Sequence, residues 1–407
     1  MQTAKKDTIL TWPFILSCIT IFFAGFAYQI LMPVVPLYVL HVGGKESQVG
    51  VVMGVAALTA LLLRPLVGYS ADRWGRKPLV ILGPATYLVT ALVYPFAGAV
   101  GPLVAVRVLH GFGLAANSTG LTTYVADRAP PHRRAEMMGT FGAALNIASA
   151  TGPFVGFWLL DTYGFDSVFM LSGVMAAIGV LLGSQIPERW ERKQDEPSTP
   201  GIAIPFSSEV LFPSILCVCV TVTFGAVTSY LAVLSDQEGI GNPGVFFLTY
   251  SLTLILVRLV SGRLADRFGR IAVVIPGFMV LAGAMLMIAA TTQIYMLAIA
   301  AVIYGMGFGS LHPTLLAMVV DRAKPGKLGV AMGTFSGAFD LGSGGGGAMW
   351  GLAVLALGVR GMYLTTALAP LLGLLLIASF RGERRRQAAL QQVTSPALSV
   401  QEGPGER

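Results

Sequence analysis

Long apolar stretches constrain the fold of this chain more than any other feature. Segments of about 20 mostly apolar residues, the length of an α-helix that crosses a bilayer, recur along nearly the whole sequence. Only 12% of the 407 residues are charged, whereas soluble globular proteins carry about 25%. The sequence lacks the alternating strands of about 10 residues that a membrane barrel requires. It therefore predicts an all-α polytopic membrane protein.

The apolar stretches divide into two sets of six. We expect transmembrane helices at about 12–40, 46–71, 78–97, 101–125, 136–160 and 167–186, and then at about 212–235, 244–264, 271–290, 294–319, 328–356 and 360–380. The predicted domains are an N-terminal six-helix half (1–187), a flexible charged linker (188–211), a C-terminal six-helix half (212–381) and a disordered polar tail (382–407).

The distribution of basic residues predicts the orientation in the membrane. Of 27 lysines and arginines, Lys45 and Arg360 fall on one face, and Arg64, Arg107 and Arg258 fall inside spans. The other 22 lie on the face that carries both termini and the linker. Because basic loops stay in the cytoplasm, we expect both termini to be cytoplasmic. Membrane orientation also explains the net charge of +7 without a nucleic-acid partner.

The chain contains an internal repeat with an offset of 194 residues. The polar loop Gly68–Lys77 returns as Gly262–Arg270, and the sequence Met-Gly-Thr-Phe occurs at both 138–141 and 332–335. Charged and glycine positions match in register, which chance similarity between apolar helices does not produce. Two six-helix halves related as parallel repeats are typical of transporters that rock around a central binding site.

These residues resemble the major facilitator superfamily, and the likeness covers nearly the whole chain. The loop Gly68–Lys77 is similar to that family's G-x-L-A-D-R-x-G-R-K signature, with Ser70 in place of leucine, and the second copy has Ile271 in place of lysine. Arg107, followed by Gly111 and Gly113, resembles the family's R-x-x-x-G motif. A further motif resembles one associated with drug–proton antiporters of the twelve-helix group, although Phe157 replaces a glycine; it consists of Gly152, Pro153 and Gly156.

The two polar loops are interpreted as a cytoplasmic gate. The resemblance implies that Asp72 lies at the positive end of helix 11 and that Arg76 pairs with Asp127, which would lock the halves together on that face. The alternative is a pair of loops that only fix orientation. The gate candidates are Gly68, Asp72, Arg73, Gly75, Arg76, Asp127, Asp266, Arg267, Arg270 and Asp321. Arg64 and Arg258, one helical turn before the loops, are expected to reach the membrane surface or to brace the same gate.

Three ionisable residues inside spans are candidates for proton coupling: Asp340, Arg107 and His110. Asp340 is the only carboxylate near the middle of a span, and its repeat partner is the neutral Asn146. It could carry a proton, or it could be a structural partner where the two halves meet. Arg107 could bind an anionic group or modulate proton transfer, or it could only bond backbone carbonyls.

Polar residues on the helices that line the family's cavity are candidates for substrate contact. They are Tyr28, Gln29, Asn117, Asn146, Tyr230, Tyr304 and His312. Each could instead be a packing residue. A cavity with few acids and an arginine favours neutral, zwitterionic or anionic solutes over strongly cationic ones.

The sequence favours a proton-coupled exporter of small organic molecules that works by alternating access. A proton symporter or a facilitator for a sugar or other nutrient is the alternative, and a membrane-embedded enzyme or receptor is disfavoured because no nucleotide loop or nucleophile–base pair is found. Three cysteines in apolar stretches predict neither a metal site nor disulfides, and no cofactor is expected. We expect a monomer, with protons and a small-molecule substrate as partners, in the lipid bilayer of a bacterial cell membrane.

Overall fold

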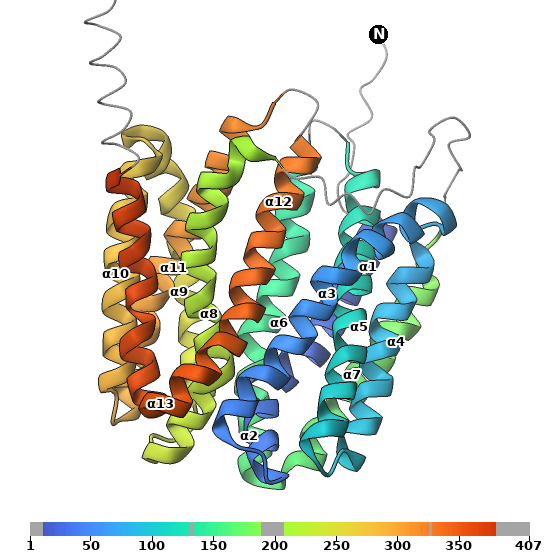
Figure 1. Cartoon of the computed structure of the whole chain (residues 1–407). Coiled ribbons are helices and arrows are strands. Elements are labelled where there is room, and N and C mark those ends of the chain that lie inside the picture. Colours follow the sequence, from blue (N-terminus) through green and yellow to red (C-terminus); the bar gives the residue numbers. More distant parts are fainter. Residues whose placement is uncertain (1–10, 131–132, 189–206, 325–327, 380–407) are drawn as a thin grey trace, which may run out of the picture.

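The chain forms a bundle of long helices that run roughly parallel to one axis (Figure 1). The computed structural model describes residues 11–130, 133–188, 207–324 and 328–379, and these contain no strand. Most of the predicted linker and the whole predicted tail lie outside the described residues. An all-helical fold is what a lipid environment demands, because a helix satisfies its backbone polar groups within one segment.

The N-terminal half makes six passes. The first is broken at Met32 and Pro33, where proline cannot donate the helical hydrogen bond. The elements are α1 (Trp12–Leu31), α2 (Val34–His41), α3 (Glu46–Trp74), α4 (Lys77–Val93), η1 (Tyr94–Phe96), α5 (Val100–Arg128), α6 (Arg134–Tyr163) and α7 (Phe165–Gln185).

The C-terminal half begins with a short turn at Ser208, slightly before the predicted boundary at 212. Its elements are η3 (Ser208–Val210), α8 (Leu211–Glu238), α9 (Gly244–Phe268), α10 (Arg270–Ala290), α11 (Ile294–Arg322), α12 (Leu328–Asp340), the π-helical turn η4 (Leu341–Gly345) and α13 (Gly346–Thr366), followed by helix 368–379.

The last helical segment crosses the membrane twice. Of the eleven apolar segments long enough to span a bilayer in the described residues, the last, Val330–Ser379, has 50 residues. At about 1.5 Å per residue it would be about 75 Å long, against a hydrocarbon core of about 30 Å. It reverses at Gly358, whose φ of 70° and ψ of 175° are accessible essentially only to glycine. The described chain therefore makes twelve passes, which confirms the predicted twelve-helix fold.

Most helix packing occurs within each half. In the first half α3 packs on α5 and α1 packs on α6 and α7, whereas in the second half α9 and α10 pack on α11. The halves meet where α3 contacts η4 and α13, and where α6 contacts α9. We call the end of the bundle where α1 begins and helix 368–379 ends the terminal face; it is at the top of Figure 1. The other end is the opposite face.

Candidate functional site

Glycines bring the two halves into backbone contact near the opposite face. A Cβ atom on Gly50 of α3 would lie 2.1 Å from the carbonyl oxygen of Gly347 of α13, and one on Gly351 would lie 2.6 Å from the carbonyl oxygen of Ser47. Small residues permit such close helix crossings in membranes. We call this the glycine contact; it comprises Gly50, Gly54, Gly344, Gly347 and Gly351. The hydrogen bond from Gln237 Nε2 to Glu46 Oε1, 2.6 Å long, also joins the halves at the opposite face.

The same helix faces separate toward the terminal face. Gly337, which follows the spacing of the glycine contact along α12, would place a Cβ 3.8 Å from Leu61, and Cβ atoms at Gly333 and Gly68 would meet nothing within 4 Å. Cβ atoms at Gly139 and Gly262, near the ends of α6 and α9 at the terminal face, would likewise meet nothing within 4 Å. The halves are therefore closed near the opposite face and diverge toward the terminal face. Gly68, one of the gate candidates, makes no close helix contact in this structure.

Asp340 pairs with Arg64 between the halves. Arg64 Nη1 lies 2.7 Å from Asp340 Oδ2, and Arg64 Nη2 donates to Asp340 Oδ1 at 3.2 Å. The side chains are 31% and 12% exposed, respectively. Arg64 lies on α3, and Asp340 is the last residue of α12, directly before the π-helical turn. A bidentate ion pair therefore joins the halves at the inner edge of the glycine contact. The Arg64 guanidinium is thus held at the contact between the halves.

Arg107 and His110 lie in a buried polar cluster of the N-terminal half. Arg107 is fully buried and donates to the carbonyl oxygens of Val52 and Met53, at 3.2 and 3.3 Å. His110, also fully buried, has Nδ1 3.3 Å from the Tyr94 hydroxyl. The rings of Tyr28 and Tyr87 each lie 5.1 Å from the His110 ring. The backbone bonds fasten α5 to α3, the helix that carries the glycine contact and Arg64.

The other cavity candidates are dispersed. Gln29 donates from Nε2 to the Ser149 hydroxyl, and Asn117 is buried against Gly83 of α4. Asn146 is half-buried on α6.

Three candidates belong to the C-terminal half. Tyr230 is buried, and its hydroxyl lies at the glycine contact, where a Cβ on Gly50 would be 2.5 Å away. The Tyr304 hydroxyl lies 3.2 Å from Thr223 Oγ1. The His312 ring stacks on Phe308, with centroids 6.0 Å apart and planes 3° apart.

The antiporter-like motif is a packing surface between α6 and α1. A Cβ on Gly156 would lie 2.6 Å from the carbonyl oxygen of Ile30, and one on Gly152 would lie 3.0 Å from Gln29 Cβ. Pro153 lies inside α6 between these contacts. The motif thus sets how closely α6 approaches the broken first pass.

The two polar loops hold equivalent ion pairs in the two halves. Arg76 Nε lies 3.0 Å from Asp127 Oδ2, and Arg270 Nε lies 3.2 Å from Asp321 Oδ2, exactly one repeat later. Arg270 also pairs with Asp266. Each pair joins the start of one helix to the end of another within its own half.

The remaining loop residues have local roles. Gly75 has a φ of 90°, and the Lys77 amide donates to Glu188 Oε2 at 2.8 Å. Arg73 is exposed and donates to the Tyr69 hydroxyl, and Arg267 lies over the Phe268 ring. The Asp72 side chain lies outside the described part of the structure.

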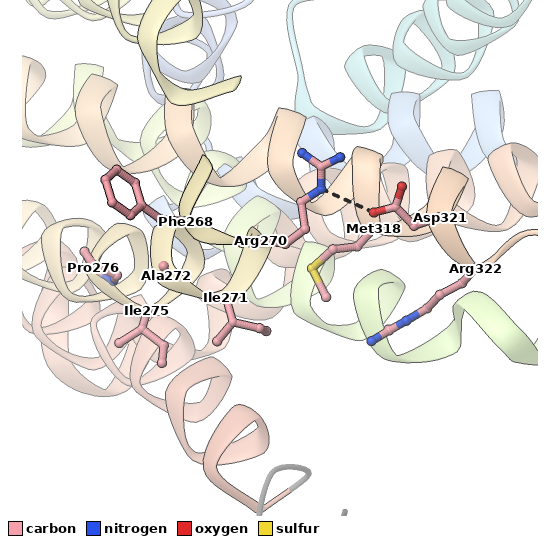
Figure 2. Close-up of a pocket in the computed structure, with 10 residues that line it drawn as sticks. Phe268, Arg270, Ile271, Ala272, Ile275, Pro276, Met318, Asp321 and Arg322 are labelled. Carbon is pink, nitrogen blue, oxygen red and sulfur yellow. Dashed lines mark hydrogen bonds and ion pairs between the residues drawn. The ribbon is translucent and has the colours of Figure 1, made fainter. Parts of the chain in front are cut away.

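A pocket of about 620 Å³ adjoins the second loop, and sequence reasoning did not anticipate it. Figure 2 shows its lining from the ends of α9, α10 and α11, including Phe268, Ile271 and Met318 beside the Arg270–Asp321 pair. The view shows apolar side chains, the Arg270–Asp321 pair and the side chain of Arg322 at the end of α11. Among the described residues, no group of three or more histidines, cysteines and acids could hold a metal ion.

The sequence matches one protein family over nearly its whole length. The model of the Major Facilitator Superfamily matches residues 17–249 and 244–400. An uncharacterized MFS-type transporter of Methanocaldococcus jannaschii is 27% identical over 380 residues, covering 90% of this chain and 96% of the relative. A multi-drug resistance efflux pump PmrA homolog of Lactococcus lactis is 26% identical, covering 77% and 80%, and the staphylopine export protein of Staphylococcus aureus is 25% identical, covering 87% and 92%.

Solved structures agree on the fold. The nucleoside transporter NupG superposes with a TM-score of 0.75 at 15% identity, over 90% of this chain and 100% of that one. The human organic anion transporter MFSD10 superposes with a TM-score of 0.67 at 18% identity, over 89% and 98%. At these identities the likeness concerns the fold alone.

Proposed function

Because the chain belongs to the major facilitator superfamily, a family of membrane transporters, we propose that it exports small organic molecules in exchange for protons. Export is supported by the two relatives named as an efflux pump homolog and an export protein. Alternating access is supported by the glycine contact, which closes the halves near one face while they diverge toward the other.

The Arg64–Asp340 ion pair is the observation that carries the proton-coupling proposal. The pair joins the two halves, and the Asp340 side chain is 12% exposed. The pair stabilises the closed interface only while Asp340 is ionised. A proton on Asp340 removes the negative charge and weakens the pair. Proton binding therefore alters the energy of the interface that alternating access must open, which is the requirement for coupling.

The proposal also covers the side of the membrane on which the terminal face lies and the role of the two polar loops there. We propose that the terminal face is cytoplasmic, so that this state receives substrate from the cell interior. The Arg76–Asp127 and Arg270–Asp321 pairs would hold the loops in shape while the halves rock. The loops would then come together when the terminal face closes.

A proton symporter or a facilitator in the same fold is the second candidate. The likeness to the nucleoside transporter NupG concerns the fold alone and is compatible with either candidate. The two candidates differ in the direction of driven flux. A proton gradient directed into the cell would drive solute export by an antiporter and solute import by a symporter. It would not drive transport by a facilitator.

Transport in proteoliposomes under an imposed pH gradient tests the proposal. We expect Asp340→Asn to reduce gradient-driven flux at least about tenfold, because the amide cannot exchange a proton, while downhill exchange of substrate continues. Arg64→Gln should also impair coupling. Asp166→Asn, a carboxylate exposed at the start of α7, is the matched control and should behave as the wild type. Undiminished gradient-driven flux in Asp340→Asn would contradict the coupling role.

A further inference from the structure

The contact between α6 and α9 repeats the contact between α3 and α13. The offset of 194 carries Gly50 to Gly244 and Ala348 back to Phe154. A Cβ on Gly244 would lie 2.6 Å from Phe154 Cα, so this second interface is also closed near the opposite face. The two interfaces are equivalent under the internal repeat, and equivalent positions along them can be compared directly.

That comparison leaves one arginine without a counter-ion. Arg64 corresponds to Arg258 and Asp340 corresponds to Asn146, so the second interface has an amide where the first has a carboxylate. Among the described residues, no carboxylate lies within ion-pair distance of Arg258, and its Nε is buried without a hydrogen-bond partner. The Ser261 hydroxyl, one turn further along α9, is also buried without a partner. A half-buried guanidinium without an anion is costly, and an anion that enters the interface would compensate for this.

His312 of α11 lies at the level of this charge. A Cβ on Gly305 of α11 would lie 3.0 Å from the Tyr250 carbonyl oxygen of α9, and one on Gly309 would lie 3.4 Å from Leu254 Cα. Continuing this packing of α9 on α11 by one more helical turn places Arg258 of α9 at the level of His312 of α11.

His312 is part of a half-buried aromatic surface formed by three helices. Its ring meets Phe339 of α12 edge-on, with centroids 5.4 Å apart, and Phe339 lies 6.4 Å from Phe224 of α8. All three rings are half-buried. Half-buried aromatic rings beside one unpaired charge are typical of sites for small amphipathic ligands.

We propose that Arg258 and the rings of Phe224, His312 and Phe339 form a substrate subsite for an aromatic carboxylate. The ligand carboxylate would pair with the Arg258 guanidinium, in the role that Asp340 has beside Arg64, and the flat apolar body would lie on the three rings. This inference rests on the proposed transport function, since it names the class of substrate. It differs from the expectation that Arg258 extends to the membrane surface.

Two probes of nearly the same shape, one anionic and one neutral, test the subsite: 1-naphthaleneacetate and its amide, 1-naphthaleneacetamide. Their affinities for the purified full-length protein in detergent are measured by calorimetry. We expect the wild type to bind the carboxylate more tightly than the amide. Arg258→Gln should weaken carboxylate binding at least about tenfold and leave amide binding unchanged, because only the ion pair is lost.

Asn146→Asp is the complementary variant. It adds the carboxylate that the repeat lacks, so it should neutralise Arg258 internally, weaken binding of 1-naphthaleneacetate to a similar extent and raise thermal stability. Arg360→Gln is the charge-matched control, because Arg360 is paired with Glu238 and lies near the opposite face; it should bind both probes as the wild type does. Equal affinity of the wild type for the two probes would overturn the proposal. An equal loss of affinity for both probes in Arg258→Gln would also overturn it.

Transport assays separate this inference from the proposed function. If binding of the carboxylate depends on Arg258 but proteoliposomes show no proton-driven export, the subsite stands and the export proposal fails. If proton-driven export of another solute is observed while Arg258→Gln binds 1-naphthaleneacetate as the wild type does, export stands and the subsite fails.

Discussion

Arg107 and Arg258 show how differently two arginines inside membrane helices can be used. Arg107 is fully buried and bonds the carbonyl oxygens of Val52 and Met53, so its contacts join helices. Arg258 is half-buried and has no anionic partner among the described residues. The sequence suggested functional roles chiefly for Arg107 and Asp340, because position along a span reveals depth but does not reveal which atoms a side chain can reach.

The contacts of Arg107 predict a contribution to stability. We expect Arg107→Gln to lower the free energy of unfolding by about 1–3 kcal/mol, because the shorter amide cannot keep both bonds to α3. Thermal unfolding of the purified protein measures this as a fall in Tm. Arg73→Gln, at an exposed arginine, should change the stability by less than about 0.5 kcal/mol. An unchanged Tm for Arg107→Gln would show that these bonds contribute nothing to stability.

At the scale of helices, glycine spacing determines where the halves touch. Gly50, Gly54 and Gly68 lie on one face of α3, and Gly337 and Gly347 follow the facing side of α12 and α13. The contact is tight at Gly50, loosens at Gly337 and is absent at Gly68. In the glycine run 342–347 the structure contains both the close packing of the glycine contact and a π-helical turn.

Gly50→Ala should disturb the closed interface near the opposite face. Its Cβ would lie 2.1 Å from the Gly347 carbonyl oxygen, so the backbones must separate. We expect transport to slow at least about tenfold, which corresponds to about 1.4 kcal/mol. Cysteines introduced at Glu46 and Gln237, which hydrogen-bond in this state, should cross-link less in the variant.

Gly283→Ala is the matched control for this variant. A Cβ at Gly283 in α10 would meet nothing within 4 Å, and alanine is the better helix former. Transport and cross-linking should therefore equal those of the parent protein. If Gly50→Ala cross-links and transports as well as Gly283→Ala, the glycine contact is not part of the transport cycle.

At the scale of the whole molecule, the distribution of charge predicts orientation. Because the number of passes is even, both ends of the described chain lie at the terminal face (Figure 1). The basic loops lie at the same face. We expect Lys45→Cys, at the opposite face, to react in intact cells with a maleimide that cannot cross the membrane. Arg73→Cys should react only after the cells are permeabilised. The reverse pattern would invert the orientation and with it the direction of the proposed transport.

The sequence by itself determined the twelve helical passes and the fold. Backbone groups in lipid must bond within their own segment, so length and hydropathy suffice to find each helix. It also revealed the 194-residue repeat, because charged and glycine positions match in register. Only the tertiary structure decided which charges meet. Arg64 reaches Asp340 across the two halves, whereas the repeat gives Arg258 the amide Asn146 in place of that carboxylate, and pairing depends on the distance between side chains that lie far apart in the sequence.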